Sequence, residues 1–308
     1  MSWTDMTQLT SCYAWFKPES LASSYANGDP ISSWADSSGN GRDVSQATSA
    51  NQPLAVANAI NGYMAADFDG SNDFLSSASY TQSGDVAVTT VLNIDSFPSL
   101  STSVNIQNSA TPASPQFVDT WVQNLFRSTG NFNCYQRASS STRFIGNLAF
   151  TPDYLSTGTS YITTFSLNSL VSDLRVNGRS LNNGANWSNL STISPPSGTA
   201  YIHLGDGYGN LNAKMTEVII YDSASLDNAE AMWVEGYLAD KYAITLAAGH
   251  LFKNEPPANP PTMYNPSSSG GGSSSPTYTS TAGTQIYPFR TLAEDDFDKG
   301  GTKFHPLS

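Results

Sequence analysis

Residues 216–257 constrain the fold more than any other part of the chain, because they combine a buried strand, a capped helix and a fixed exit from the helix. The β-branched and aromatic run over 217–221 predicts a strand. Asp227 and Glu230 form an N-cap pair that predicts the start of a helix. Apolar or small residues recur at helical spacing on one face of this helix, namely Ala229, Met232, Trp233, Gly236 and Tyr237. We expect this strand and helix to close a domain that ends at Pro257.

Most of the chain before this segment has the pattern of β-strands. Ser, Thr, Asn and Gly are abundant and charged residues make up only 12% of the chain, which is typical of a β-sandwich with many turns. Asn177-Gly178 predicts a two-residue hairpin, because both residues tolerate positive φ. The pattern favours one large all-β domain over two equal domains. Strands are predicted near residues 12–16, 65–68, 74–77, 86–94, 103–107, 116–118, 125–128, 132–136, 143–148, 161–167, 172–176, 200–204 and 216–221.

Several motifs resemble those of a known family. They are AWFKPESL, ISSWADSSGNGRDVSQAT and AADFDGSNDFLSS in the first 80 residues, and LDNAEAMWVEGYLADKY followed by HLFKNEPP near the end. Over residues 10–257 the chain is similar to laminin-G-like, concanavalin A-like lectin/glucanase domains, which occur in phage structural proteins and bacterial surface proteins. The resemblance implies a two-sheet antiparallel jelly roll with one short C-terminal helix. It does not fix an activity, because function is grafted onto such folds.

The composition changes after Asn254. Two Pro-Pro pairs and the run SSSGGGSSS cannot bury enough apolar surface to fold, so residues 258–284 are predicted to be a linker between the domain at 1–257 and a C-terminal peptide at 285–308. The peptide regains apolar side chains, which is the layout of a docking tail; a disordered terminus is the alternative. The predicted anchors are Ile286, Tyr287, Phe289, Phe297 and Phe304.

The carboxylates do not have the spacing of a glycan hydrolase. Hydrolases of this fold place acidic residues two apart on one strand, because only residues i and i+2 project from the same face. Here Glu217 is the only glutamate on its predicted strand, Glu230 and Glu235 lie on the predicted helix, and Glu294 begins an acidic run in the tail. We therefore expect a protein that is not an enzyme and needs no cofactor.

Two loops carry candidate ligand-binding residues. Trp34 and Asp36 could present a ring and a carboxylate to a sugar, although a core tryptophan and a turn-capping aspartate fit the same pattern. Trp187, Tyr208 and Asn210 are further candidates. His203, as a lone histidine, is more often satisfied in a core than a ligand. A calcium ion is the only cofactor considered, with weak candidate ligands at Asp69, Asn72, Asp73 and Asp206.

The charge balance argues against some partners. The net charge is −12, and the 13 Lys and Arg residues form no cluster that could follow a phosphate backbone, so nucleic acid is not expected as a partner. No apolar run approaches the ~18 residues of a membrane span, and the first residues lack the pattern of a signal peptide. We therefore expect synthesis in a cytoplasm, with a membrane excluded as partner.

These observations lead to three hypotheses. The first is a non-enzymatic phage virion protein on a capsid or tail, which is attached to other virion proteins through its C-terminal tail and binds host-surface glycans, with a homo-oligomer possible. The second is a bacterial carbohydrate-binding module or adhesin domain, placed outside the cell or at its surface. The third is a glycan hydrolase with an unfamiliar carboxylate pair.

Overall fold

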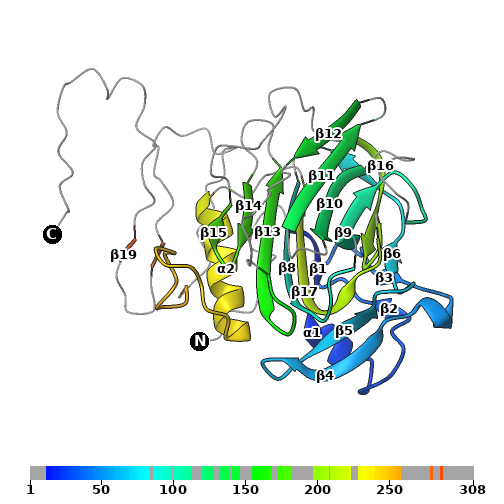
Figure 1. The fold of residues 1–308 in the computed structure, drawn as a ribbon, viewed down its shortest axis with the longest axis horizontal. Helices are drawn as coiled ribbons and strands as arrows, with labels where there is room; N and C mark the ends of the chain where they lie inside the picture. The colour runs from blue at the N-terminus through cyan, green and yellow to red at the C-terminus, as the bar shows by residue number, and fades with distance from the viewer. Residues whose placement is uncertain are drawn as a thin grey trace.

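The chain folds into two stacked antiparallel β-sheets with a helix on one side (Figure 1). This arrangement confirms the predicted all-β sandwich. The computed structural model describes residues 12–83, 86–98, 100–112, 120–127, 132–138, 141–145, 155–167, 173–181, 197–207, 209–222, 228–257, 278–279 and 285–286.

The first sheet, called sheet A, has eight strands built around one long strand. β17 (Asn212–Asp222) pairs with β8 along most of its length, with β5 near its start and with β1 near its end. Beyond β8 the order continues through β13 and β14 to β15, and beyond β5 it ends at β4. The other strands are β1 (Cys12–Phe16), β4 (Leu54–Ile60), β5 (Tyr63–Asp69), β8 (Val86–Ile94), β13 (Ser160–Leu167), β14 (Asp173–Val176) and β15 (Arg179–Ser180).

The second sheet, called sheet B, has nine strands in the order β12-β11-β10-β9-β16-β6-β3-β2, with β7 paired to β16. Several of them are only two or three residues long, and these short strands lie at one end of the sheet. The strands are β2 (Ser33–Trp34), β3 (Val44–Ser45), β6 (Leu75–Ser77), β7 (Tyr80–Ser83), β9 (Leu100–Gln107), β10 (Thr120–Arg127), β11 (Phe132–Ala138), β12 (Ser141–Ile145) and β16 (Ser197–Leu204).

The main core lies between the two sheets. It includes Val88 and Leu92 of β8, which belong to the same buried cluster as Val104 and Ile106 of β9. On β8 the alternate residues Ala87 and Val91 face the other way, into a second cluster. Sheet A is thus covered on both faces at β8, which explains why β8 is buried along nearly its whole length rather than at alternate positions.

The second cluster is covered by α2 (Asn228–Tyr242), which lies on the face of sheet A that points away from sheet B (Figure 1). Trp233 is fully buried there, and Tyr237 is nearly so. The predicted helix is therefore confirmed, and its burial extends beyond the predicted face to Ala231, Val234, Leu238 and Ala239. The predicted cap residue Asp227 and the side chain of Ala229 lie outside the described residues. Two short helical segments, α1 (Pro18–Ala22) and the 3₁₀ turn η2 (Ser49–Asn51), lie in connections between strands.

The predicted strands and the observed ones differ at three short strands and at the seven-residue strand β4. The sequence pattern does not predict β2, β3, β4 or β7, and the predicted strand at 116–118 lies outside the described residues. The hairpin at Asn177-Gly178 is confirmed, with φ of 47° and 76° between β14 and β15. Among the described residues, no helix is long and apolar enough to cross a membrane.

A small hairpin occurs in the C-terminal region. β18 (Tyr278–Thr279) pairs with β19 (Gln285–Ile286) in a two-stranded sheet of its own. The predicted linker at 258–284 therefore contains a short strand that the composition does not indicate. Of the five predicted anchors, Ile286 lies on β19, and the other four lie outside the described residues.

Candidate functional site

The outer face of sheet B carries a row of uncharged polar side chains. Strand pairing places His203 of β16 opposite Asn105 of β9 on one side and opposite Ser76 of β6 on the other. One pair further along, Tyr201 lies opposite Gln107. The alternate residues on β9 and β16 are the core residues Val104, Ile106, Ile202 and Leu204. Because successive side chains of a strand point to opposite faces, the polar row faces away from the core.

The row is partly buried and partly exposed. His203, Asn105 and Gln107 have no exposed surface, whereas Tyr201 and Ser76 are partly exposed. Polar side chains on an outward face are normally open to water, so their complete burial needs a cover. Part of that cover is the segment 108–112, whose backbone oxygens contact two of the three buried side chains.

The hydrogen bonds of His203 show which of its ring nitrogens carries the proton. Its Nε2 lies 2.9 Å from the carbonyl oxygen of Ser109, and its Nδ1 lies 2.6 Å from the Ser76 hydroxyl. A carbonyl oxygen can only accept, so Nε2 carries the proton and donates it, and Nδ1 accepts from Ser76. Burial lowers the pKa of His203 to about 4. The imidazole is therefore uncharged at neutral pH.

Two amide side chains form a chain of hydrogen bonds with a fixed direction. Gln107 Nε2 donates to the carbonyl oxygen of Thr111 at 2.8 Å, which orients the Gln107 amide. Gln107 Oε1 then accepts from Asn105 Nδ2, also at 2.8 Å. The remaining atom, Asn105 Oδ1, is buried and has no hydrogen-bond partner among the described residues. A buried acceptor without a donor costs free energy, so this oxygen is a place where an added donor would stabilise the protein.

One of the two partly exposed residues of the row, Tyr201, has an aromatic ring. The Tyr201 ring stacks on the imidazole of His203, with centroids 6.4 Å apart and ring planes inclined by 22°. Tyr201 lies between this buried neighbour and solvent, so part of its ring stays exposed in a fixed orientation. A ring of this kind offers the apolar surface on which the C–H face of a sugar can stack, beside side chains that both donate and accept hydrogen bonds.

Sheet B contains no acidic residue. Within the bounds of its nine strands there is no Asp or Glu, and the only charged residues are Arg127, Arg137 and Arg143 of β10 to β12. Glycosidases need a pair of carboxyl groups at the scissile bond in most families. The strands of this sheet cannot supply such a pair.

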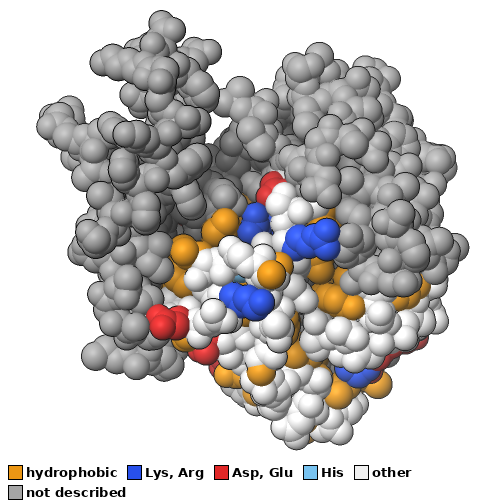
Figure 2. Space-filling view, turned by 60° about the vertical axis from the view of Figure 1, so that its left-hand side comes forward, with side chains coloured by type: hydrophobic (Ala, Val, Ile, Leu, Met, Phe, Trp, Pro, Cys, Tyr) orange, Lys and Arg blue, Asp and Glu red, His pale blue; other side chains and the backbone are white. Residues whose placement is uncertain are grey.

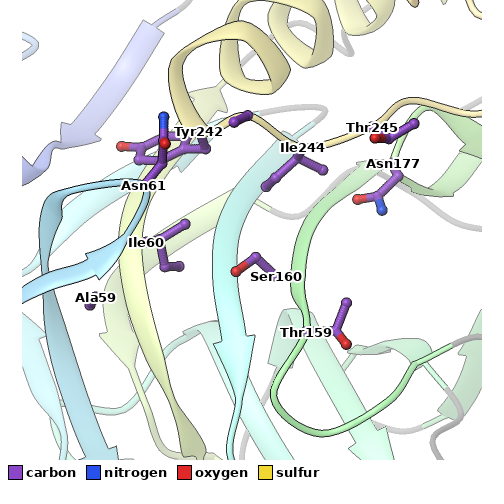
Figure 3. Close-up of a pocket in the computed structure, with 10 residues that line it drawn as sticks. Ala59, Ile60, Asn61, Thr159, Ser160, Asn177, Tyr242, Ile244 and Thr245 are labelled. Carbon is purple, nitrogen blue, oxygen red and sulfur yellow. The ribbon is translucent and has the colours of Figure 1, made fainter.

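A second candidate is a hollow of about 450 Å³ at the C-terminal end of α2 (Figure 3). Its polar lining groups are largely engaged in holding the fold. Asn61 Nδ2 donates to the Lys241 carbonyl at 2.9 Å, and Asn177 Oδ1 accepts from the Ile162 amide at 2.8 Å. The Tyr242 hydroxyl donates to Glu217. These three side chains therefore serve the fold, and Thr159, Ser160 and Thr245 are the other polar side chains of the lining.

Trp34 and Asp36, the first candidates from the sequence, are structural. Trp34 has no exposed surface and its Nε1 donates to the Lys17 carbonyl at 3.1 Å, so the ring cannot stack on a sugar. Both oxygens of Asp36 accept hydrogen bonds: Oδ1 from the amides of Trp15 and Ser38, and Oδ2 from the Ser38 hydroxyl and the Arg42 amide. Asp36 thus holds the loop at 36–43 against Trp15 of β1, and Trp34 is a core residue, as in the structural alternative that the sequence offered.

The other predicted ligand residues are only partly described. Trp187 and Tyr208 lie outside the described residues. Asn210 donates through Nδ2 to the Ser71 carbonyl and so ties two turns together. Asn210 thus lies in the loop before β17 and not in the polar row of sheet B.

The candidate calcium ligands are used within turns. Asp69 Oδ1 accepts from the Ser71 amide at 2.7 Å, Asp73 Oδ2 from the Asp69 amide at 3.0 Å, and Asp206 Oδ1 from the Gly207 amide at 2.6 Å. Asn72 Nδ2 donates to the Ala50 carbonyl and to Asn51. Within the part of the chain that the structure describes, no group of three or more His, Cys, Asp or Glu side chains is placed to hold a metal ion.

Figure 2 shows another face of the molecule, on which the Lys and Arg side chains of the described residues lie apart from one another. A surface that follows a nucleic-acid backbone needs basic side chains in a continuous patch or stripe. No such stripe is visible on that face.

Comparison with known proteins gives only distant matches. No family model matches the sequence, and no curated protein is similar to it. Among solved structures, the chain resembles the Trypanosoma rangeli sialidase in complex with the inhibitor DANA, with 12% identity and a TM-score of 0.48 over 74% of this chain and 33% of the sialidase. The chain thus spans about a third of that sialidase.

Two further matches are arabinan-related. Domain 4 of AbnA, a GH43 extracellular arabinanase from Geobacillus stearothermophilus in complex with arabinotriose, has 15% identity and a TM-score of 0.47 over 71% of this chain and 96% of that domain. A mutant GH54 α-L-arabinofuranosidase soaked with 4-nitrophenyl α-L-arabinofuranoside has 12% identity and a TM-score of 0.47 over 75% of this chain and 59% of the enzyme.

These comparisons correct the leading hypothesis from the sequence. The structures that resemble the chain are glycoside hydrolases or a domain of one, and nothing in them points to a virion. The prediction of a phage virion structural protein is therefore wrong. The two-sheet β-sandwich itself is shown by the strand pairing of this chain.

The polar row on sheet B is not among the sites predicted from the sequence. The signal is present as alternation, because polar and core residues alternate in Val104-Asn105-Ile106-Gln107 and in Tyr201-Ile202-His203-Leu204. The sequence favours a core role for His203 because no partner is visible near it in the chain. Its partners, Ser76 and Ser109, are 127 and 94 residues away.

Proposed function

We propose that this protein is a non-catalytic saccharide-binding module that holds its ligand on the outer face of sheet B. The observation that carries the proposal is the uncharged polar row beside a partly exposed ring, made of Ser76, His203, Asn105, Gln107 and Tyr201. Sugars present hydroxyl groups that donate and accept hydrogen bonds, together with C–H faces that stack on aromatic rings. The row offers both kinds of contact.

The absence of acidic residues from the strands of sheet B supports a binding role over hydrolysis. The buried glutamates of the described structure are also committed to the fold. Glu217 accepts from Trp15 and Tyr242, and Glu235 accepts from Arg175. The resemblance of the sequence motifs to laminin-G-like and concanavalin A-like lectin domains is compatible with this proposal and forms part of it.

A glycan array followed by calorimetric titration tests the proposal. We expect the chain to bind at least one class of polysaccharide, and Tyr201→Ala to weaken that binding by roughly tenfold, since an aromatic contact contributes on the order of 1 kcal/mol. Tyr63→Ala is the matched control, because Tyr63 is also partly exposed but lies on sheet A beside α2.

Two results would overturn the proposal. Binding that is the same in the wild type and in Tyr201→Ala would remove the face of sheet B as the site. Release of reducing sugar from the bound polysaccharide by the purified chain would show that the protein is a hydrolase and not a binding module.

A further inference from the structure

The oxygen Asn105 Oδ1 sets a chemical requirement on any ligand that reaches it. The Thr111 carbonyl can only accept a hydrogen bond, so the Gln107 amide points its nitrogen at Thr111 and its oxygen at Asn105. Asn105 therefore donates through Nδ2 to Gln107, and its own oxygen points away from Gln107. This oxygen is buried and lacks a partner among the described residues. A ligand that contacts it must therefore offer a hydrogen-bond donor.

Two hydrogen-bond donors of the row already bind acceptors of the protein itself. His203 Nε2–H donates to the Ser109 carbonyl and Gln107 Nε2–H donates to the Thr111 carbonyl, so two backbone oxygens of the segment 108–112 occupy positions next to the row. A sugar hydroxyl can replace such a carbonyl, because its oxygen accepts a hydrogen bond from the same donor. Unlike the carbonyl, the hydroxyl also has a proton to give to Asn105 Oδ1.

Since Asn105, Gln107 and His203 have no exposed surface, a ligand reaches them only when their cover, which includes the segment 108–112, moves away. On the basis of the proposed function, we propose that Asn105, Gln107 and His203 form a subsite for a sugar hydroxyl. Residues 108–112 help to cover this subsite in the free protein, and the subsite selects uncharged sugars over acidic ones.

The selectivity follows from the difference between a hydroxyl and a carboxylate. An ionised carboxylate has acceptors only, so it cannot satisfy Asn105 Oδ1 and instead places a second acceptor next to it. No cation is available in the row, because burial lowers the pKa of His203 and keeps it neutral at pH 7, and Asn105, Gln107, Ser76 and Tyr201 carry no charge. The net charge of −12 also repels an anionic polymer.

The first test compares polysaccharides that differ only at C6. Titration of the full chain with β-1,4-glucan and β-1,4-glucuronan, and with β-1,4-mannan and β-1,4-mannuronan, gives two matched pairs. We expect the uncharged member of the bound pair to bind about tenfold or more tightly than its acidic counterpart. Equal affinity for both members, or a preference for the acidic one through Arg127, Arg137 and Arg143, would overturn the inference.

The second test uses Asn105→Leu, which keeps the size of the side chain but removes the acceptor. We expect it to bind the uncharged polysaccharide about tenfold more weakly. Asn93→Leu in sheet A is the matched control, and we expect it to leave the affinity unchanged. Unchanged affinity in Asn105→Leu, with circular dichroism like that of the wild type, would overturn the subsite. If this variant does not fold, the matched pairs on the wild type decide.

Hydrogen exchange tests the cover. If a ligand displaces the segment 108–112, the amides of that segment exchange faster at saturation with the bound polysaccharide than in the free protein. Slower exchange would mean that the ligand binds on top of the segment, which would overturn the covered subsite.

The outcomes also separate this inference from the proposed function. A wild-type chain that binds no member of any pair contradicts both. A chain that binds through Tyr201, but binds uncharged and acidic members equally, keeps the proposed function and removes only the hydroxyl subsite.

Discussion

Arg175 and Glu235 form a buried ion pair that joins β14 of sheet A to α2. Arg175 Nε lies 2.9 Å from Glu235 Oε1, and a second guanidinium nitrogen lies 3.0 Å from Oε2. His250, from the segment after α2, lies 3.2 Å from the same Oε2. Burial alone would raise the pKa of Glu235, but the hydrogen bond from His250 and the charge and hydrogen bonds of Arg175 lower it. The helix, the strand and the C-terminal segment are thus held at one carboxylate.

Breaking this pair is expected to destabilise the fold strongly. Arg175→Met leaves a buried carboxylate without its main partner, and we expect a loss of about 3–5 kcal/mol in the free energy of unfolding, measured by urea denaturation. The double variant Arg175→Met/Glu235→Leu removes both charges and is expected to be more stable than Arg175→Met alone. Arg179→Ala, at an exposed neighbouring position, is the control and should change stability by less than about 1 kcal/mol. A loss for Arg175→Met no larger than that of the control contradicts the structural role.

Stability is expected to fall as the pH drops below about 6.5, because His203 stays unprotonated in the folded protein. The pKa of His203 is lowered from 6.5 to about 4, so between these values the unfolded chain binds a proton that the folded chain does not. The contribution is fully present above pH 6.5 and is lost as the pH falls through 4, with a total of up to about 3 kcal/mol.

The variant His203→Gln isolates this effect, because glutamine can keep both hydrogen bonds but does not titrate. Urea unfolding at pH 7.5 and pH 4.5 should show a larger loss of stability in the wild type than in the variant. The same pH dependence in both proteins would show that His203 titrates normally in the folded state.

Gly236 is expected to resist substitution even though it lies within a helix. A Cβ at this position would lie 2.7 Å from the Cβ of Phe252, which packs across α2. Gly236→Ala should therefore destabilise the protein by about 1–3 kcal/mol, against the intrinsic preference of helices for alanine. Asp240→Ala, at an exposed position of the same helix, provides the comparison and should be near neutral. Thermal melting of the two variants checks this, and an unchanged melting temperature for Gly236→Ala would mean that Phe252 can move aside.

Asp36→Ala is expected to reduce stability without reducing saccharide binding. The carboxylate accepts four hydrogen bonds that hold the loop at 36–43, so its removal should cost about 3 kcal/mol. Asp43→Ala, which removes one bond to the Asp36 amide, should cost about 1 kcal/mol. Titration of the folded variants with the bound polysaccharide separates the two roles of Asp36, since a direct ligand would show a weakened affinity.

The fold could largely be predicted from local patterns, and the candidate site could not. The helical spacing of Trp233 and Tyr237 predicts α2, and β-branched and alternating runs predict most of the longer strands, although the seven-residue β4 is missed. β2 and β3 have two residues each, which is too short for any periodicity to register. The pairing of β3 depends on β6, which lies some 30 residues further along the chain, and not on local sequence.

The site depends on contacts between distant strands. Asn105 and His203 become neighbours only through the pairing of β9 with β16, and the orphan oxygen of Asn105 arises only when Gln107 is oriented by Thr111. Trp34 shows an ambiguity that the sequence cannot resolve. A tryptophan next to polar loop residues has the same sequence pattern whether it forms a sugar platform or fills the core, and burial decides between them.

The most direct test of the account is a crystal structure of the full chain with a bound oligosaccharide from the polysaccharide class that it recognises. The account predicts a sugar ring against Tyr201, with a hydroxyl group between Asn105 Oδ1 and His203 Nε2. A sugar bound in the hollow at the end of α2, or elsewhere with the face of sheet B unoccupied, would contradict it.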